Sequence, residues 1–339
     1  MNSREIVRRA LTFRAPDRVP RQLWVLPWAE DRYSREVERL RERFPDDIVT
    51  APCFFLHPPP TRGEEYGPGT YVDEWGCVFE NIERGIIGEV KRPLVGDWGE
   101  ADRIRTPVER LSVDVGRVNA FVAGTDRFVL APTRIRPFEQ LQYLRGPENL
   151  FLDLAERPEG LFRLLERLHD FYKRELALWA ATDVDGLQIM DDWGGQHALL
   201  VSPVLWRELF KPLYRDYAAV ARGGGKFLFM HSDGFIADII DDLIEVGVDA
   251  LNSQLFCMDI EDLGRRFAGR LTFWGEMDRQ RLLPSGSADD VRRAVRRVRH
   301  ALWREGGAVA QCEFGPGARP ENVAAVFEAW DEPISRNPG

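Results

Sequence analysis

Residues 226–252 read KFLFMHSDGFIADIIDDLIEVGVDALN, and this stretch decides the fold. It begins with an apolar run, 226–230, that is typical of a strand buried on both faces. An apolar stripe at helical spacing then extends from Phe235 to Ile244 and stops at Gly247, a residue that often ends helices. A second short apolar run, 250–252, follows directly. This order predicts two parallel strands joined by a helical crossover, the unit from which α/β folds are built.

The same alternation continues on both sides of this stretch. Further strands are predicted at 128–133, 186–190, 271–274 and 308–311, with weaker candidates at 22–26 and 250–252. Ser202 and Pro203 are placed as the N-cap and first residue of a helix that Pro212 should kink. Another helix is predicted over 288–303. Together these elements predict an α/β fold, a single (β/α)8 TIM barrel.

Composition restricts the class of protein. The 339 residues are 44% hydrophobic and 30% charged, which is ordinary for a folded domain. The net charge of −9 disfavours nucleic acid as a partner, because phosphate binding normally needs a basic surface. The N-terminal residues are charged throughout, and no stretch approaches 18 apolar residues, so we expect a cytoplasmic protein without a membrane segment. The four cysteines lack CxxC spacing, so any cysteine chemistry needs residues that converge in space.

Polar residues gather where the predicted strands end. In a barrel of this kind the active site lies where strands end and βα loops begin. The residues there are Arg134, Arg136, Asp191, Asp192, Trp193, His231, Asp233, Gln254, Glu276, Asp278, Cys312 and Glu313. A purely structural barrel has no reason to collect ionisable groups at one rim. The accumulation therefore predicts an enzyme.

Several of these residues also have a structural interpretation. His231 opens the run His-Ser-Asp-Gly, in which imidazole and carboxylate could hold one metal ion, yet a histidine after a strand is often only hydrogen-bonded. Asp191 and Asp192 could cap the next turn, or could serve in acid/base chemistry or orient a metal-bound ligand. Cys312 alone is typical of a small buried residue, although Glu313 beside it favours a site.

Segments from Gln188 to Trp330 resemble the uroporphyrinogen decarboxylase superfamily, which includes zinc-dependent corrinoid and thiol methyltransferases. The supporting segments are 190–196 (MDDWGGQ), 202–212 (SPVLWRELFKP), 231–234 (HSDG), 242–252 (DLIEVGVDALN), 275–278 (GEMD) and 319–322 (RPEN), with 73–76 (DEWG), 92–94 (RPL) and 143–146 (YLRG) upstream. The resemblance implies one barrel domain over 1–339. Its best-matching core is 121–332, and 1–120 is an N-terminal part with loop insertions.

The chain departs from the decarboxylases of this superfamily at its first βα loop. They begin that loop with an Arg-Gln-Ala-Gly-Arg motif that grips substrate carboxylates, whereas residues 27–31 here read PWAED. They also have a Ser where this chain has Asp192, and a Gly-His-Gly loop where it has 315–317 (GPG). A carboxylate-rich rim repels an octa-anionic tetrapyrrole unless cations compensate. We therefore expect no decarboxylation of uroporphyrinogen.

The methyltransferase branch implies a zinc site. Its members hold zinc with a His-x-Cys motif and a second Cys near the C-terminus; here His231 remains, Asp233 replaces the motif Cys, and Cys312 lies near the second Cys position. We expect His231, Asp233 and Cys312 as ligands, with Glu276 or Glu313 as a fourth. A carboxylate in place of a thiolate makes the ion harder and more Lewis acidic.

The leading hypothesis is a metal-dependent enzyme, with zinc, that transfers a methyl or another small group. Asp191 or Asp192 would orient or deprotonate the substrate, and Glu276 or Asp278 would act as acid or base. The expected substrate-binding residues are Trp28, Trp75, Tyr143, Trp193, Gln254 and Arg134, the last as an anion clamp. A corrinoid protein is the expected methyl donor, and the chain is expected to be a monomer or homodimer. Two alternatives remain: a decarboxylase or lyase acting on an acidic or tetrapyrrole-like substrate, and a non-catalytic barrel that binds a tetrapyrrole or a corrinoid protein.

Overall fold

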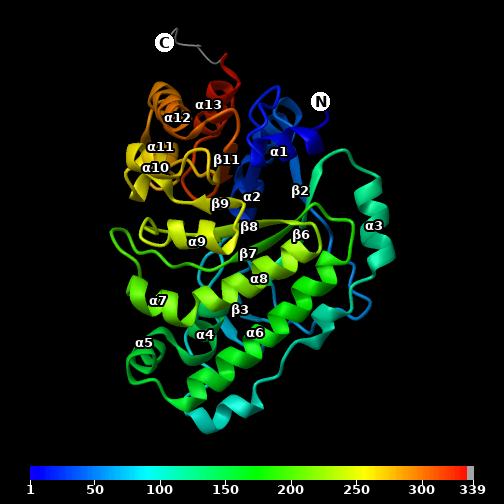
Figure 1. The fold of residues 1–339 in the computed structure, drawn as a ribbon, viewed down its shortest axis with the longest axis vertical. Coiled ribbons are helices and arrows are strands. Elements are labelled where there is room, and N and C mark those ends of the chain that lie inside the picture. Colours follow the sequence, from blue (N-terminus) through cyan, green and yellow to red (C-terminus); the bar gives the residue numbers. More distant parts are fainter. Residues whose placement is uncertain (334–339) are drawn as a thin grey trace.

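The structure, a computed structural model that describes residues 1–333, is built around one sheet of eight strands (Figure 1). The strands, in sheet order, are β1 (Arg21–Val25), β11 (Ala308–Phe314), β10 (Thr272–Trp274), β9 (Ala250–Ser253), β8 (Phe227–Ser232), β7 (Gly186–Met190), β6 (Phe128–Ile135) and β2 (Ile48–Thr50). All neighbouring pairs are parallel. The first and last strands of this order, β1 and β2, also meet. The backbone N–H of Asp47, next to β2, donates to the Arg21 carbonyl in β1 at 2.9 Å, and Gln22 Nε2 donates to the Ile48 carbonyl at 3.3 Å. The predicted α/β barrel is confirmed.

The N-terminal end of the barrel is closed by helix α1 (Ser3–Leu11). Its Val7 and Leu11 pack against the interior side chains, among them Phe128, Phe229 and Trp274. These large apolar residues alternate along their strands with residues that face the outer helices, as the period of two requires. The opposite end, where the strands terminate, is the end at which barrels of this kind carry their active sites.

Helices cover the outside of the sheet. They are α2 (Pro27–Arg43), α4 (Pro137–Arg145), α5 (Pro147–Glu156), α6 (Glu159–Ala180), α7 (Pro203–Leu209), α8 (Lys211–Gly223), α9 (Ile240–Val246), α10 (Ile260–Phe267), α11 (Leu282–Ser285), α12 (Ala288–Leu302) and α13 (Pro320–Asp331). The long α6 runs beside α8, and α12 beside α13 (Figure 1). No helix among residues 1–333 combines the length and the apolar character needed to cross a bilayer.

A long insertion, residues 51–127, separates β2 from β6. It contains a three-stranded antiparallel sheet of β3 (Gly69–Val72), β4 (Val78–Asn81) and β5 (Glu89–Val90). Two short 3-10 helices, η1 (Trp98–Arg103) and η2 (Val108–Leu111), and helix α3 (Val115–Ala123) complete it. The insertion packs on α6 and α4, so it covers one side of the barrel mouth.

Two helices differ from the prediction. The apolar stripe begins at Phe235, but helix α9 begins only at Ile240. Gly234 has φ +78°, and the N–H of Phe235 donates to the carbonyl of Gly195 and not to a carbonyl within a helix. The expected kink at Pro212 is a full break, with α7 ending at Leu209 and α8 beginning at Lys211. Ser202 does cap α7, since its hydroxyl accepts from the N–H of Leu205 at 3.2 Å.

Candidate metal centre

The ends of β7 and β8 are tied together by backbone hydrogen bonds. The N–H of Asp191 donates to His231 and the N–H of Gly194 to Asp233, both at 3.0 Å. A Cβ on Gly234 would lie 2.1 Å from the carbonyl oxygen of Gly194, so the chains approach this closely only with glycine at that position. This close pairing places Asp192 beside the His-Ser-Asp run.

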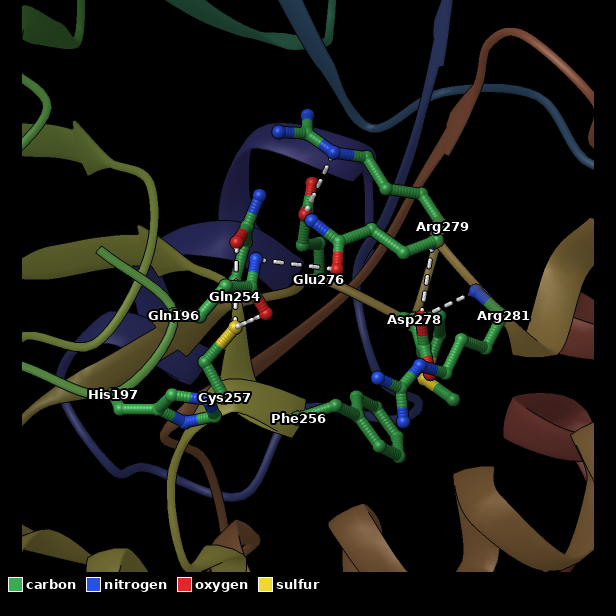
Figure 2. A pocket seen from close by; sticks show the side chains of 11 residues that line it. Gln196, His197, Gln254, Phe256, Cys257, Glu276, Asp278, Arg279 and Arg281 are labelled. Atoms are coloured by element: carbon green, nitrogen blue, oxygen red, sulfur yellow. Dashed lines mark hydrogen bonds and ion pairs between the residues drawn. The ribbon is translucent and has the colours of Figure 1, made fainter. Parts of the chain in front are cut away.

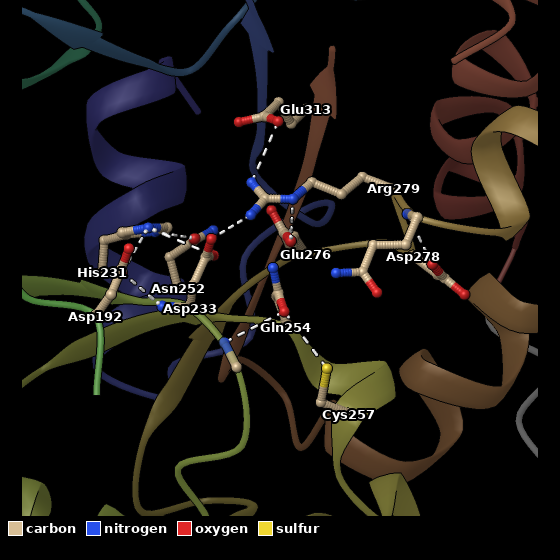
Figure 3. Close-up of polar contacts among 12 residues, drawn as sticks. Asp192, His231, Asp233, Asn252, Gln254, Cys257, Glu276, Asp278, Arg279 and Glu313 are labelled. Atoms are coloured by element: carbon tan, nitrogen blue, oxygen red, sulfur yellow. Dashed lines mark hydrogen bonds and ion pairs between the residues drawn. The ribbon is translucent and has the colours of Figure 1, made fainter. Parts of the chain in front are cut away.

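Asp192, His231 and Asp233 converge at this point (Figure 3). One ligand atom from each lies within 4.8 Å of the others. Nε2 of His231 is 3.5 Å from Oδ1 of Asp192 and 3.6 Å from Oδ1 of Asp233. The Asp192 side chain is the most open of the three, with 39% of its surface exposed, against 12% for His231. The group therefore faces the barrel mouth through Asp192.

The imidazole of His231 is held in one orientation by Asn252 on β9. The Asn252 amide nitrogen donates to the Trp274 carbonyl, so its oxygen is the atom that faces His231. His231 Nδ1–H therefore donates to that oxygen, at 2.6 Å, and Nε2 points at the two aspartates. Burial lowers the pKa of His231, but Asp192, Asp233, the hydrogen bond to Asn252 and Glu276 together raise it by more. A cation at Nε2, whether a proton or a metal ion, is favoured here.

The spacing fits a metal ion. Zinc with bonds of about 2.0–2.1 Å in tetrahedral geometry separates its ligand atoms by about 3.3–3.4 Å, close to the distances from His231 to the two aspartates. Oδ1 of Asp233 is buried and has no hydrogen-bond partner among the described residues, although its Oδ2 is paired with Arg279. A buried carboxylate oxygen without a partner is costly, and a bound cation would satisfy it.

Arg279, in the loop after β10, links the metal group to two further carboxylates. Its guanidinium pairs with Asp233, with Glu276 at 3.4 Å and with Glu313 at 3.2 Å (Figure 3). Burial raises the pKa of Glu276 to about 8, because it outweighs the opposing effect of Arg279. Glu276 thus holds a proton at neutral pH, as a general acid must. Glu313, predicted as a ligand, is joined to the group through Arg279.

A pocket of about 150 Å³ opens beside Glu276 and Arg279 (Figure 2). Two other predicted residues, Gln254 and Asp278, also line it. Gln254 accepts from the N–H of Gly234 at 3.2 Å, which connects this pocket to the metal group. Charged, amide and apolar side chains line the pocket together, and its volume lies below the about 300–1,000 Å³ typical of drug-sized ligand sites.

Cys312 is not part of the group. Strand β11 continues to Phe314, and within it Cys312 pairs with Leu23, whose side chain packs in the layer between sheet and helices. The Cys312 side chain lies in the same apolar layer and is fully buried. Neighbouring residues of a strand face opposite sides, so Glu313 faces the barrel mouth and Cys312 faces away from it. This corrects the prediction that Cys312 lies beside His231 and Asp233.

Asp191 and Trp193 are also buried away from the mouth. The Asp191 carboxylate accepts from the N–H of Phe138 at 2.9 Å, from the N–H of Glu139 at 2.7 Å and from the Tyr214 hydroxyl at 2.7 Å. Asp191 therefore has a structural role, as one alternative expected, but it caps the start of α4, which precedes it in the chain, and not the turn that follows it. Trp193 stacks on Phe138 with ring centres 4.2 Å apart and is fully buried.

The remaining aromatic and arginine candidates lie around the insertion. Trp75, Arg134 and Tyr143 line a second, smaller cavity of about 30 Å³. Arg134 is held by Glu65 through two contacts of 3.1 Å. Trp28, at the start of α2, is covered by the guanidinium of Arg32, 4.5 Å from its ring centre. The expected substrate-binding residues thus fall in separate places.

Asp73, which also lines the second cavity, gives a stability test. Burial, with Glu74, raises its pKa to about 7. At a pH between the unfolded-state and folded-state pKa values, the folded state holds a proton that the unfolded state has released. The stabilisation is fully present below pH ~4 and is lost as pH rises through 7, at up to about 1.4 kcal/mol per pH unit. Asp73→Asn should flatten this fall in urea denaturation between about pH 5 and pH 7.5. Asp170→Asn, at an exposed position, is the control and should leave the slope unchanged.

Three residues at the site were not among the predicted site residues. Asn252 ends a weakly predicted strand, and its place at that end could have indicated it. Arg279 lies in a loop and Glu139 begins α4, so neither follows a strand directly. The carboxyl of Glu139 accepts from the Tyr143 hydroxyl at 2.9 Å. Burial raises the pKa of Glu139, and Arg136, 3.9 Å away, opposes this shift.

Comparisons with known proteins give a consistent result. A family model described as uroporphyrinogen decarboxylase (URO-D) matches residues 76–333. The uroporphyrinogen decarboxylase of Xylella fastidiosa is 30% identical over 187 residues, covering 51% of this chain and 49% of that protein. That of Methylococcus capsulatus is 27% identical over 185 residues, covering 53% and 50%. The chain thus matches about half the length of these curated relatives.

Among solved structures, a methyltransferase from Methanosarcina mazei superposes with a TM-score of 0.65. The match covers 98% of both chains at 16% sequence identity. At this identity the likeness shows a shared fold.

Proposed function

Because this chain belongs to the uroporphyrinogen decarboxylase family, we propose that it is an enzyme that uses a divalent ion, zinc in the first instance, to transfer a methyl or another small group. The observation that carries the proposal is the convergence of Asp192, His231 and Asp233, with the imidazole fixed by Asn252. One nitrogen and two carboxylate donors suit a Lewis-acidic zinc ion.

Each residue has a role in this proposal. His231, Asp192 and Asp233 would hold the ion, which supplies Lewis acidity and lowers the pKa of a bound thiol, alcohol or water. Asp192, the most open ligand, is placed to orient the incoming group. Glu276, which keeps its proton at neutral pH, would donate it to a leaving group that departs through oxygen or nitrogen; a corrinoid donor needs no proton on leaving. Arg279 holds Asp233 and Glu276 in position. A corrinoid protein is the proposed methyl donor.

Decarboxylation of an acidic substrate is the second candidate. It is favoured by the similarity to the uroporphyrinogen decarboxylases of Xylella fastidiosa and Methylococcus capsulatus. The absence of the Arg-Gln-Ala-Gly-Arg motif at residues 27–31 stands against uroporphyrinogen itself as the substrate. Robust conversion of uroporphyrinogen to coproporphyrinogen by metal-free protein would favour this candidate over the first.

Neighbouring aspartates provide the test of the metal centre. Asp192→Asn should weaken zinc binding by about tenfold or more, because a neutral amide replaces an anionic ligand, and should leave the unfolding midpoint of the metal-free protein unchanged. Asp191→Asn should keep one bound zinc but lose about 1–3 kcal/mol of stability, because an NH2 group replaces one of two accepting oxygens and leaves a buried donor without a partner. Zinc content and competition titration measure the first effect, and urea denaturation the second. Wild-type protein that binds no zinc, or Asp192→Asn protein that binds it equally well, would refute the proposal.

A further inference from the structure

Three arginines line the second cavity, between the three-stranded sheet and helices α4 and α6, and they differ in how many carboxylates they pair with. Arg110 pairs with Glu175 and with Glu74, the latter at 3.1 Å. Arg134 is engaged by both carboxylate oxygens of Glu65. These two guanidinium groups are neutralised by protein carboxylates.

Arg136 is held much more loosely. Its side chain is only 16% exposed, yet its polar side-chain contacts among residues 1–333 are 3.4 Å to the Tyr143 hydroxyl and 3.9 Å to a Glu139 carboxylate oxygen, and its guanidinium lies 6.0 Å from the Tyr143 ring centre. A guanidinium has five N–H donors, and these contacts use few of them. Arg136 therefore has donors available for a ligand.

A second donor faces the same cavity. The hydroxyl of Tyr172 is buried and has no hydrogen-bond partner among the described residues. Tyr172 and Arg136 line the cavity together. Its volume of about 30 Å³ exceeds the 10–15 Å³ that one water needs, and suits the two oxygens of a carboxylate. Planar carboxylates match the guanidinium fork in a bidentate arrangement.

The cavity adjoins the metal group. Strand β6 ends next to β7, where Ile135 pairs with Ile189, so Arg136 and Asp192 lie on neighbouring strand ends. Glu139 lies 3.9 Å from Arg136. A molecule bound at Arg136 would need to extend from the end of β6 to the end of β7 to reach Asp192.

We propose that Arg136 and Tyr172 bind a carboxylate of the substrate and thereby hold its reacting end at the metal group. This inference rests on the proposed function and names the substrate class: a small carboxylic acid. Glu65 is paired with Arg134, and Arg110 is shared by Glu74 and Glu175. The carboxylate that lies against Arg136 is that of Glu139, at 3.9 Å.

The test uses propionate, and propionamide as its neutral counterpart, titrated into zinc-loaded full-length protein with calorimetric detection. Wild-type protein should bind propionate at least about tenfold more tightly than propionamide, equivalent to about 1.4 kcal/mol. Arg136→Gln should lose at least about tenfold in propionate affinity, and Arg136→Lys should lose less, because it keeps the charge without the fork. Tyr172→Phe should also weaken binding, whereas Tyr217→Phe, at an equally buried position outside the cavity, should not.

Metal measurements separate this proposal from the previous one. Arg136→Gln should keep its zinc, and Asp192→Asn should keep its propionate site. Equal affinity for propionate and propionamide, unchanged propionate binding in folded Arg136→Gln protein, or no propionate binding by wild type would overturn the carboxylate site, whatever the zinc content. Loss of zinc binding with propionate binding intact would instead contradict the metal centre alone.

Discussion

Arg110→Met is expected to lower the free energy of unfolding by about 3–5 kcal/mol, because the substitution leaves buried carboxylates without their counter-charge. Arg110 joins η2 of the insertion to Glu175 on α6 and to Glu74 after β3. The side chains are almost fully buried, with exposures of 6% for Arg110, 0% for Glu175 and 8% for Glu74. Urea denaturation followed by circular dichroism measures the change.

The matched control is Arg157→Met, which removes a bidentate but exposed pair with Glu208 and should leave the midpoint nearly unchanged. Adding Glu175→Leu to Arg110→Met should recover part of the lost stability, since it removes one of the stranded carboxylates. A loss below about 1 kcal/mol in Arg110→Met would show that Glu175 and Glu74 become neutral, or reach water, at little cost.

Asn252→Ala is expected to weaken zinc binding by about 10–100-fold, although Asn252 is not one of the three proposed ligands. Groups that hydrogen-bond the outer nitrogen of a ligand histidine fix its tautomer and orientation, and their loss typically has this effect. Here the Asn252 oxygen accepts from Nδ1 of His231, so without it the imidazole can rotate or expose the wrong nitrogen to Asp192 and Asp233. Competition with a chromophoric chelator measures the affinity.

Asn322→Ala is the control for the loss of a buried amide. Asn322 is equally buried, and its amide donates to the carbonyls of Leu283 at 2.9 Å and Gly286 at 3.0 Å, away from His231. Both variants should lose stability, and only Asn252→Ala should lose zinc affinity. Equal zinc affinity in Asn252→Ala and wild-type protein would mean that His231 is oriented by other contacts, such as the Trp24 ring 5.7 Å away.

The barrel could be predicted because its central strands are apolar runs separated by well-bounded helices. Residues 186–190 form β7 with the predicted bounds, and 226–230 lie within a residue of the start of β8. The second strand, β2, was missed because only Ile48, Val49 and Thr50 belong to it, too few for a pattern. The strands of the insertion alternate weakly and include Gly69 and Glu80, so their sequence resembles a loop.

The site residues that could be predicted are those that directly follow a recognisable strand. His231 and Asp233 follow from the end of the β8 run, but Cys312 was misplaced because β11 continues three residues beyond the predicted end at Gln311. Inside a strand, neighbours face opposite sides, so this extension decides that Glu313 and not Cys312 faces the mouth. Which of Asp191 and Asp192 turns inward depends on contacts with α4 that no local pattern contains.

The outward turn of Cys312 also affects how the centre would respond to oxidants. The three converging residues offer imidazole and carboxylate atoms and no sulfur. Peroxides disrupt thiolate sites by converting the sulfur to sulfenic and higher acids, whereas carboxylates and imidazoles do not undergo this chemistry. Zinc bound by His231 and the two aspartates would therefore stay in place during exposure to air or hydrogen peroxide, under conditions that release it from cysteine ligands.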